Sequence, residues 1–384
     1  MNMILEKAKG DRAIWVVVVL LSVFSLLAVY SSTGTLAYRF RSGNTEYYAI
    51  KHFLIQLMGL VLMYLASKVK YTYYSRISQI ALWVAIPLLI FTIIKGTTIN
   101  EAARWITLPI INVSFQSSDF AKLALIIYVA RLLAKKQDVI KDLKGGFFET
   151  LIPILLITGL ILPENLSTAG LLFVTCVVIM FIGGVSFRHL LIVSGIGAVV
   201  LMFLIFMFIT FKPDQGRVSV WVNRVEAHFV SEQMPYQVEQ SKIAIASGGI
   251  LGKMPGNSTQ RNFLPHAYSD FIYAIIIEEY GLVGGLFVIV LYLILFYRGI
   301  KIARKSPGTF GALVAAGLSF SLVFQAFINM AVAVNIVPVT GQPLPLISMG
   351  GTSIWFTSIA IGIVLSVSRK ADENELNNVS NVKA

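Results

Sequence analysis

The sequence predicts an all-α integral membrane protein with about ten transmembrane helices, and two observations lead to this fold class. First, 57% of the 384 residues are hydrophobic and only 13% are charged, which is about half the charged fraction of an ordinary soluble domain. Second, the apolar residues form repeated runs that are long enough to cross a bilayer as helices. We expect spans at about 13–31, 50–67, 78–96, 117–134, 147–163, 166–184, 188–211, 270–297, 310–334 and 350–368.

The basic residues predict that both ends of the chain lie in the cytoplasm. With the N-terminus inside, the cytoplasmic segments hold 19 of the 31 basic residues and the short outer loops hold five. This asymmetry favours an N-in, C-in topology with an even number of spans. One large extracytoplasmic loop, about 212–269, then connects spans seven and eight. We predict one membrane domain over 1–369 and a disordered cytoplasmic tail over 370–384.

Several classes of protein are excluded or disfavoured. No basic, aromatic-studded face suggests a nucleic-acid partner. The one cysteine, Cys176, lies in an apolar run, which excludes a disulfide within the chain. The four histidines are scattered, and the chain has no Walker or Rossmann glycine loop, so a metal cluster and an ATP-driven pump are disfavoured.

The large loop contains an expected amphipathic helix over 236–246, which Gly248 and Gly249 would close as a left-handed cap. Its apolar face would present Val238, Ile243 and Ile245, and its polar face Gln237, Gln240 and Ser241. Of these residues, Gln240 is a candidate for substrate binding.

Asp270 stands where the large loop meets span eight. Ionised groups near hydrocarbon are costly and are often functional. The structural alternative is a helix N-cap made by Ser269 or Asp270. Such a cap does not exclude catalysis, because a helix N-terminus keeps a carboxylate ionised and available as a general base.

Span four carries Asp119 and Lys122, whose i,i+3 spacing puts them on one helix face. They form a self-neutralising pair, or Lys122 snorkels to the interface, or the pair faces a polar cavity. In that cavity Lys122 would meet Asp270 or a substrate phosphate.

Arg104 precedes Trp105 in a predicted outer loop. An arginine at this place suits phosphate recognition, because its donors match phosphate oxygens. An interfacial anchor is the alternative.

Glu278 and Glu279 lie inside span eight. Adjacent helical residues point about 100° apart, so we expect that the two cannot face the same partner. At least one should face a polar interior or a cation, in a structural helix–helix hydrogen bond or in a direct role.

The segment 335–353 between spans nine and ten contains three prolines and three glycines. These residues forbid a regular helix, and irregular backbone at membrane depth is tolerated only within protein or beside water. Thr340 and Ser348 are candidates to contact a pyrophosphate or a sugar. A plain re-entrant structural loop is the alternative.

Four segments together resemble the SEDS family (shape, elongation, division and sporulation), the FtsW/RodA membrane glycosyltransferases. They are residues 100–122, 163–169, 236–281 and 338–353. The run of Gly256, Asn257 and Ser258 before Leu264 and Pro265 is more similar to the division branch, FtsW, than to the elongation branch, RodA. The chain departs from the family pattern at Ser117 and Asp119, where the family usually has Pro and Glu.

The resemblance implies a peptidoglycan polymerase in the bacterial cytoplasmic membrane that uses lipid II and acts at the division septum. It implies that Asp270 is catalytic, that Lys122 binds substrate, and that a divalent cation, Mg²⁺ or Mn²⁺, takes part, with its ligands unknown. It also implies a class B penicillin-binding protein and other divisome proteins as partners.

We therefore expect an inverting glycosyl transfer that releases undecaprenyl diphosphate. A lipid II flippase is a rival from a different class, because charges inside the membrane and broken helices suit a transporter equally. An elongation-type polymerase and a scaffold that only recruits the transpeptidase are further alternatives.

Overall fold

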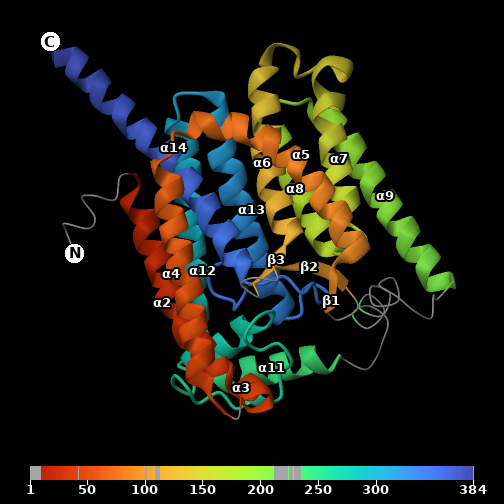
Figure 1. The fold of residues 1–384 in the computed structure, drawn as a ribbon, viewed down its shortest axis with the longest axis vertical. Coiled ribbons are helices and arrows are strands. Elements are labelled where there is room, and N and C mark those ends of the chain that lie inside the picture. The colour runs from red at the N-terminus through yellow and green to blue at the C-terminus, as the bar shows by residue number, and fades with distance from the viewer. Residues whose placement is uncertain are drawn as a thin grey trace. The chain divides into compact units, whose positions relative to one another are not determined.

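The computed structural model describes residues 10–41, 43–99, 102–108, 113–211, 224, 228 and 235–383. Within these ranges every predicted span coincides with a helix (Figure 1). The helices are α2 (Arg12–Ser32), α4 (Thr45–Lys68), α5 (Tyr71–Lys95), α6 (Ser117–Lys135), α7 (Phe148–Ile161), α8 (Leu166–Ile182), α9 (Phe187–Phe211), α12 (Ile272–Lys305), α13 (Thr309–Ala333) and α14 (Thr352–Lys383). In the described part of the chain, six of them (α2, α4, α5, α12, α13 and α14) are long and apolar enough to cross a membrane. The multi-pass helical fold is confirmed, and the exact number of spans stays a prediction.

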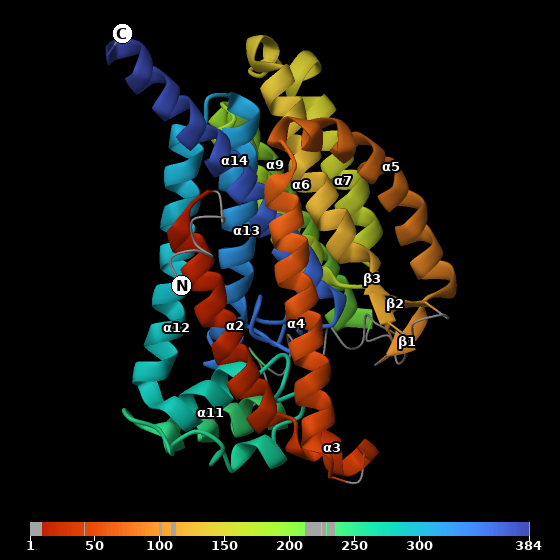
Figure 2. The ribbon, with the colours of Figure 1, turned by 60° about the vertical axis from the view of Figure 1, so that its left-hand side comes forward.

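The chain divides into two compact units, and the single membrane domain over residues 1–369 stays a prediction. Unit 1 comprises Met1–Leu65, Arg224–Arg298 and Leu322–Ile359. In this unit α2 and α4 run side by side (Figures 1 and 2), and the Ser25 hydroxyl joins them by a hydrogen bond of 2.7 Å to His52 Nε2.

Unit 2 comprises Ala66–Asn223, Gly299–Ser321 and Ala360–Ala384. Thr92 on α5 donates to the Ser117 hydroxyl on α6 at 2.9 Å. Between these helices lies a three-stranded antiparallel sheet in the order β1 (Thr97–Ile99), β2 (Ala102–Leu108) and β3 (Val113–Gln116). We predicted only a loop here, because strands of three to seven residues give too weak a periodic pattern to recognise.

In unit 1, α12 is kinked at Gly281, whose φ is +69°. The kink frees backbone donors that the chain after α11 (Tyr236–Gly248) satisfies, since Leu282 N–H donates to the Gly249 carbonyl at 3.0 Å. Lys253 N–H donates in turn to the Glu278 carbonyl at 2.9 Å. A broken helix is stable where neighbouring backbone takes up its freed groups.

The helix expected in the large loop is confirmed as α11, and Gly249 closes it with a positive φ of +55°. The predicted orientation is wrong at Ser241, which we expected to face water. Ser241 is buried, and its hydroxyl donates to the Ala333 carbonyl at 2.7 Å. Ile243 is exposed, and its predicted contact with lipid or protein stays a prediction. Small residues decide which face packs inward, since a side chain at Gly248 would come within 2.1 Å of the Ile277 carbonyl oxygen.

The predicted disordered tail is also corrected. α14 continues through Lys383. Its polar extension contains no proline or glycine. Glu373 also pairs one turn back with Arg369 and Lys370 at 3.8 and 3.4 Å, a spacing that supports helix.

Candidate functional site

Asp270 lies on a turn two residues before α12 begins at Ile272. The next residues, Phe271 and Ile272, are buried, and so is Ala267 on the preceding side. Asp270 itself is half-buried. Apolar anchors on both sides therefore hold the carboxylate at the edge of the core, where another molecule can reach it.

Two side chains fasten the backbone of this turn to the irregular segment after α13. Asn329 on α13 donates through Nδ2 to the Asp270 carbonyl at 2.9 Å and to the Gln342 carbonyl at 2.7 Å. Ser348 donates to the Ser269 carbonyl at 2.6 Å. Asn329 and Ser348 are both almost fully buried, so these bonds fix the position of Asp270.

The segment itself is irregular, as predicted, and side chains from several helices satisfy its carbonyls. These bonds run from Ser25 to Ile347, from Gln56 to Leu346, from Tyr292 to Pro345 and from Gln325 to Pro343. Irregular backbone inside a membrane protein needs such partners. These bonds hold the backbone of the segment in one position next to Asp270.

Arg224 is a residue of this site that our sequence analysis did not single out. Its Nη1 donates to the Val339 carbonyl at 3.1 Å. Burial lowers the pKa of the Arg224 guanidinium, and the charge of the nearby Asp270 carboxylate opposes that shift. Only the tertiary fold reveals that the two charges are near each other, because Arg224 lies in the large loop far along the chain from Asp270.

The other predicted polar contacts of this region remain predictions. The Ser348 hydroxyl already accepts from Leu344 N–H at 2.7 Å and donates to Ser269, so the protein uses it structurally. The Thr340 hydroxyl is buried and has no hydrogen-bond partner among the described residues. Gln240 on α11 is half-buried. A direct contact of any of the three with substrate is untested.

On α6 the predicted pair is confirmed, since Lys122 Nζ lies 3.3 Å from Asp119 Oδ1. Asp119 is buried, and its Oδ2 has no hydrogen-bond partner among the described residues. Lys122 belongs to unit 2 and Asp270 to unit 1, and a meeting of the two stays a prediction.

Arg104 lies in β2, next to Trp105, which pairs with Thr97 on β1 and with Gln116 on β3. Its side chain lies outside what the structure describes. A role of Arg104 in phosphate binding is therefore untested.

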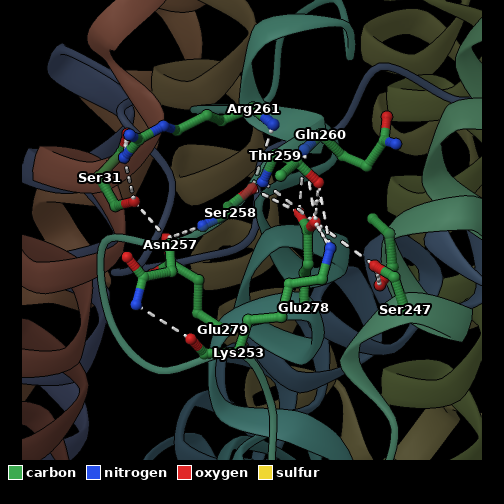
Figure 3. A network of polar contacts seen from close by, with 11 residues as sticks. Ser31, Ser247, Lys253, Asn257, Ser258, Thr259, Gln260, Arg261, Glu278 and Glu279 are labelled. Atoms are coloured by element: carbon green, nitrogen blue, oxygen red, sulfur yellow. Dashed lines mark hydrogen bonds and ion pairs between the residues drawn. The ribbon is translucent and has the colours of Figure 1, made fainter.

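Glu278 and Glu279 are buried at the centre of a polar network (Figure 3). Glu278 accepts from Lys253 Nζ at 2.7 Å and from the Thr259 hydroxyl at 2.9 Å. Glu279 accepts from the Ser31 hydroxyl on α2. The prediction that at least one carboxylate faces a polar interior or a cation is confirmed, since Glu278 pairs with Lys253.

The prediction that the two glutamates cannot face the same partner is wrong. Ser258 donates through its hydroxyl to Glu278 and through its backbone N–H to Glu279 at 3.3 Å. Ser258 bridges the 100° separation of adjacent helical side chains because it offers two donors, its hydroxyl and its backbone N–H (Figure 3). The pair therefore binds the loop, residues 253–261, to α12.

The described residues do not form a metal site by themselves. No group of three or more His, Cys, Asp and Glu side chains gathers within the described ranges. One charged neighbour of Asp270 is the cation Arg224. One carboxylate beside a cation does not fit a site made of protein ligands alone.

Comparison with known proteins identifies the family. The model of the cell cycle protein family FtsW/RodA/SpoVE matches residues 11–373. The probable peptidoglycan glycosyltransferase FtsW of Trichlorobacter lovleyi is 31% identical over 370 residues, which cover 94% of this chain and 93% of that protein. The stage V sporulation protein E of Bacillus subtilis is 30% identical over 369 residues, which cover 95% of this chain and 98% of that protein.

Two solved structures share the fold. A chain from a study of polymerization and crosslinking by a peptidoglycan synthase complex superposes with a TM-score of 0.76 at 24% identity, covering 94% of this chain and 98% of that chain. The rod shape determining protein RodA of Thermus thermophilus superposes with a TM-score of 0.67 at 24% identity, and the match covers 94% of this chain and 97% of that chain. The chain therefore belongs to the FtsW/RodA/SpoVE family of cell cycle proteins.

Proposed function

We propose that this protein is a membrane glycosyltransferase that polymerises lipid II into peptidoglycan glycan strands on the outer face of the bacterial cytoplasmic membrane, for septal wall synthesis. The names of its relatives support a peptidoglycan glycosyltransferase. The observation that carries the proposal is Asp270, a half-buried carboxylate on a turn that Asn329 and Ser348 fix in place.

In the proposed reaction, Asp270 accepts the proton of the acceptor sugar's 4-hydroxyl. The resulting oxygen nucleophile attacks the anomeric carbon of the donor glycan. A new glycosidic C–O bond forms as the bond to the lipid diphosphate breaks, with inversion at that carbon. Undecaprenyl diphosphate leaves, and the proton passes from Asp270 to water. A positioned general base supplies about 10²–10⁴-fold in rate.

Arg104 and Lys122 are kept as candidates to contact phosphate. The divalent cation is also kept as a proposal, and it would supply charge neutralisation at the diphosphate. Mg²⁺ is commonly held by one or two carboxylates together with substrate phosphates, and its protein ligands here stay unassigned. A class B penicillin-binding protein is the proposed partner.

The test is polymerisation of purified, labelled lipid II in detergent by the chain with its cognate class B transpeptidase. Glycan products are resolved on a gel for wild type and Asp270→Asn. The matched control is Asp138→Asn, which changes an exposed aspartate of unit 2. We expect glycan from wild type and from the control and almost none from Asp270→Asn. Full synthesis by Asp270→Asn would remove Asp270 from the mechanism.

Lipid II transport is the second candidate, because the break in α12 at Gly281 resembles the interrupted helices of transporters. The same experiment separates the two. Polymerised glycan in detergent needs no membrane sidedness, whereas transport produces no glycan and requires two compartments.

A further inference from the structure

Arg224 and Asp270 border the same glycine. A Cβ placed on Gly341 would lie 3.6 Å from Asp270 Oδ2 and 4.0 Å from Arg224 Nη1. Gly341 has a φ of +65°, which side chains rarely adopt. Glycine therefore lets the backbone take this turn directly beside both charged groups.

The guanidinium of Arg224 has donors to spare. It carries five N–H groups. Among the described residues, its one hydrogen-bond acceptor is the Val339 carbonyl, which binds Nη1. Arg224 is half-buried, so the remaining donors are poorly hydrated and yet within reach of a ligand. A planar fork of donors in such a place suits a phosphate, which it binds through two parallel hydrogen bonds.

The charges also explain why a cation is needed at this position. A diphosphate that approaches the Asp270 carboxylate meets a like charge, which is unfavourable in poorly hydrated surroundings. Arg224 balances that carboxylate and can at the same time neutralise negative charge that develops on a leaving diphosphate.

We propose that Arg224 binds the diphosphate of the lipid-linked substrate and places its reacting carbon beside Asp270. This inference rests on the proposed function and adds to it the residue that holds the leaving group. Arg224 and Asp270 then form one site in unit 1, and Gly341 lies next to both side chains.

The test uses the full chain in complex with its transpeptidase and compares Arg224→Gln and Arg224→Lys with wild type. The matched control is Lys242→Gln, which removes one positive charge from an exposed position on α11. Initial rates at several lipid II concentrations give KM and kcat, and inorganic pyrophosphate serves as a competing probe. Thermal unfolding of each variant reports its Tm.

We expect Arg224→Gln to raise KM and to weaken inhibition by pyrophosphate by about 10- to 100-fold each, the range for a lost charge-assisted hydrogen bond. Arg224→Lys keeps the charge but loses the fork, so it should recover part of the inhibition. It can also still donate to Val339, which makes it the informative variant if Arg224→Gln fails to fold. Lys242→Gln should match wild type.

Unchanged KM and unchanged pyrophosphate inhibition in folded Arg224→Gln or Arg224→Lys would overturn the inference. A lower Tm with unchanged inhibition would likewise assign Arg224 a purely structural role. Neither result touches the proposed function, which fails if wild type makes no glycan. Full synthesis by Asp270→Asn would remove Asp270 from the mechanism.

Discussion

Asp270 and the Glu278–Glu279 pair lie within one short stretch of chain, yet they occupy opposite environments. Glu278 has no exposed surface and accepts hydrogen bonds from Lys253, Ser258 and Thr259. Asp270 is half-buried beside the cation Arg224. The glutamates are enclosed by donors of their own chain, whereas another molecule can reach Asp270.

The comparison separates two uses of a carboxylate near a membrane. A fully buried carboxylate is tolerated when donors surround it, and it then fixes the structure around it. A carboxylate that reacts must remain reachable and must keep a defined position. Here the glutamates hold the loop, residues 253–261, that leads to the turn of Asp270. The structural carboxylates therefore support the position of the carboxylate that we propose to react.

The first prediction concerns Asp270→Asn and has the largest expected effect. It should lower kcat by about 10²–10⁴-fold, because a general base is lost. The Tm should stay close to that of wild type, since the turn is held through its backbone by Asn329 and Ser348. If Asp270→Asn lowered the Tm as much as Glu278→Gln does, Asp270 would be a structural carboxylate like Glu278.

The second prediction concerns the kink just after the glutamates. In Gly281→Ala the new Cβ would lie 2.1 Å from the Ile250 carbonyl oxygen, at a φ of +69°. Overlap with backbone and a strained φ should together cost about 3 kcal/mol or more, measured as a lower Tm in detergent. The matched control is Gly195→Ala on α9, where a Cβ meets nothing within 4 Å.

The third prediction is that Glu278→Gln loses stability rather than chemistry. Removing one partner of a buried ion pair costs about 3–5 kcal/mol. Because the Lys253 side chain is 30% exposed, solvent screens part of this interaction. We therefore expect Glu278→Gln to lower the free energy of unfolding by about 2 kcal/mol. Thermal unfolding measures the loss, and kcat per folded molecule should change by less than about threefold.

A double-mutant cycle with Lys253→Met checks the origin of that loss. The two changes together should cost less than the sum of the separate changes, because they share one ion pair. Strict additivity would show that Lys253 contributes nothing to the burial of Glu278.

The fourth prediction has the smallest effect and concerns the bonds that fix the turn of Asp270. Asn329→Leu removes the donor that Asp270 and Gln342 share, at 2.9 and 2.7 Å. Displacement of Asp270 should lower kcat by about tenfold, which corresponds to about 1.4 kcal/mol. Gln325→Leu, which loses the bond to the Pro343 carbonyl and leaves Asn329 in place, should change the Tm more than kcat. Equal effects on kcat would show that Asn329 has no special part in positioning Asp270.

Most helices were predictable because apolar length is a local property. α2 begins at Arg12 and α12 at Ile272, each within two residues of its predicted start. The pair of Asp119 and Lys122 was predictable for the same reason, since residues three apart on a helix are neighbours. The break of α12 was not predictable, because Gly281 stands in a run whose hydropathy is that of a continuous helix.

The sequence by itself determined the membrane helices, the irregular segment after α13 and Asp270 as the candidate for chemistry. The helices and the irregular segment follow from composition and from local backbone rules, which operate over a few residues. The position of Asp270 left a helix N-cap as an alternative, and the family resemblance implied its catalytic role. Only the tertiary structure decided that Asn329 and Ser348 hold Asp270, that Arg224 lies beside it and that Ser258 joins both glutamates. Those contacts connect segments far apart in the chain, and no spacing along a single sequence records which distant residues become neighbours when the chain packs.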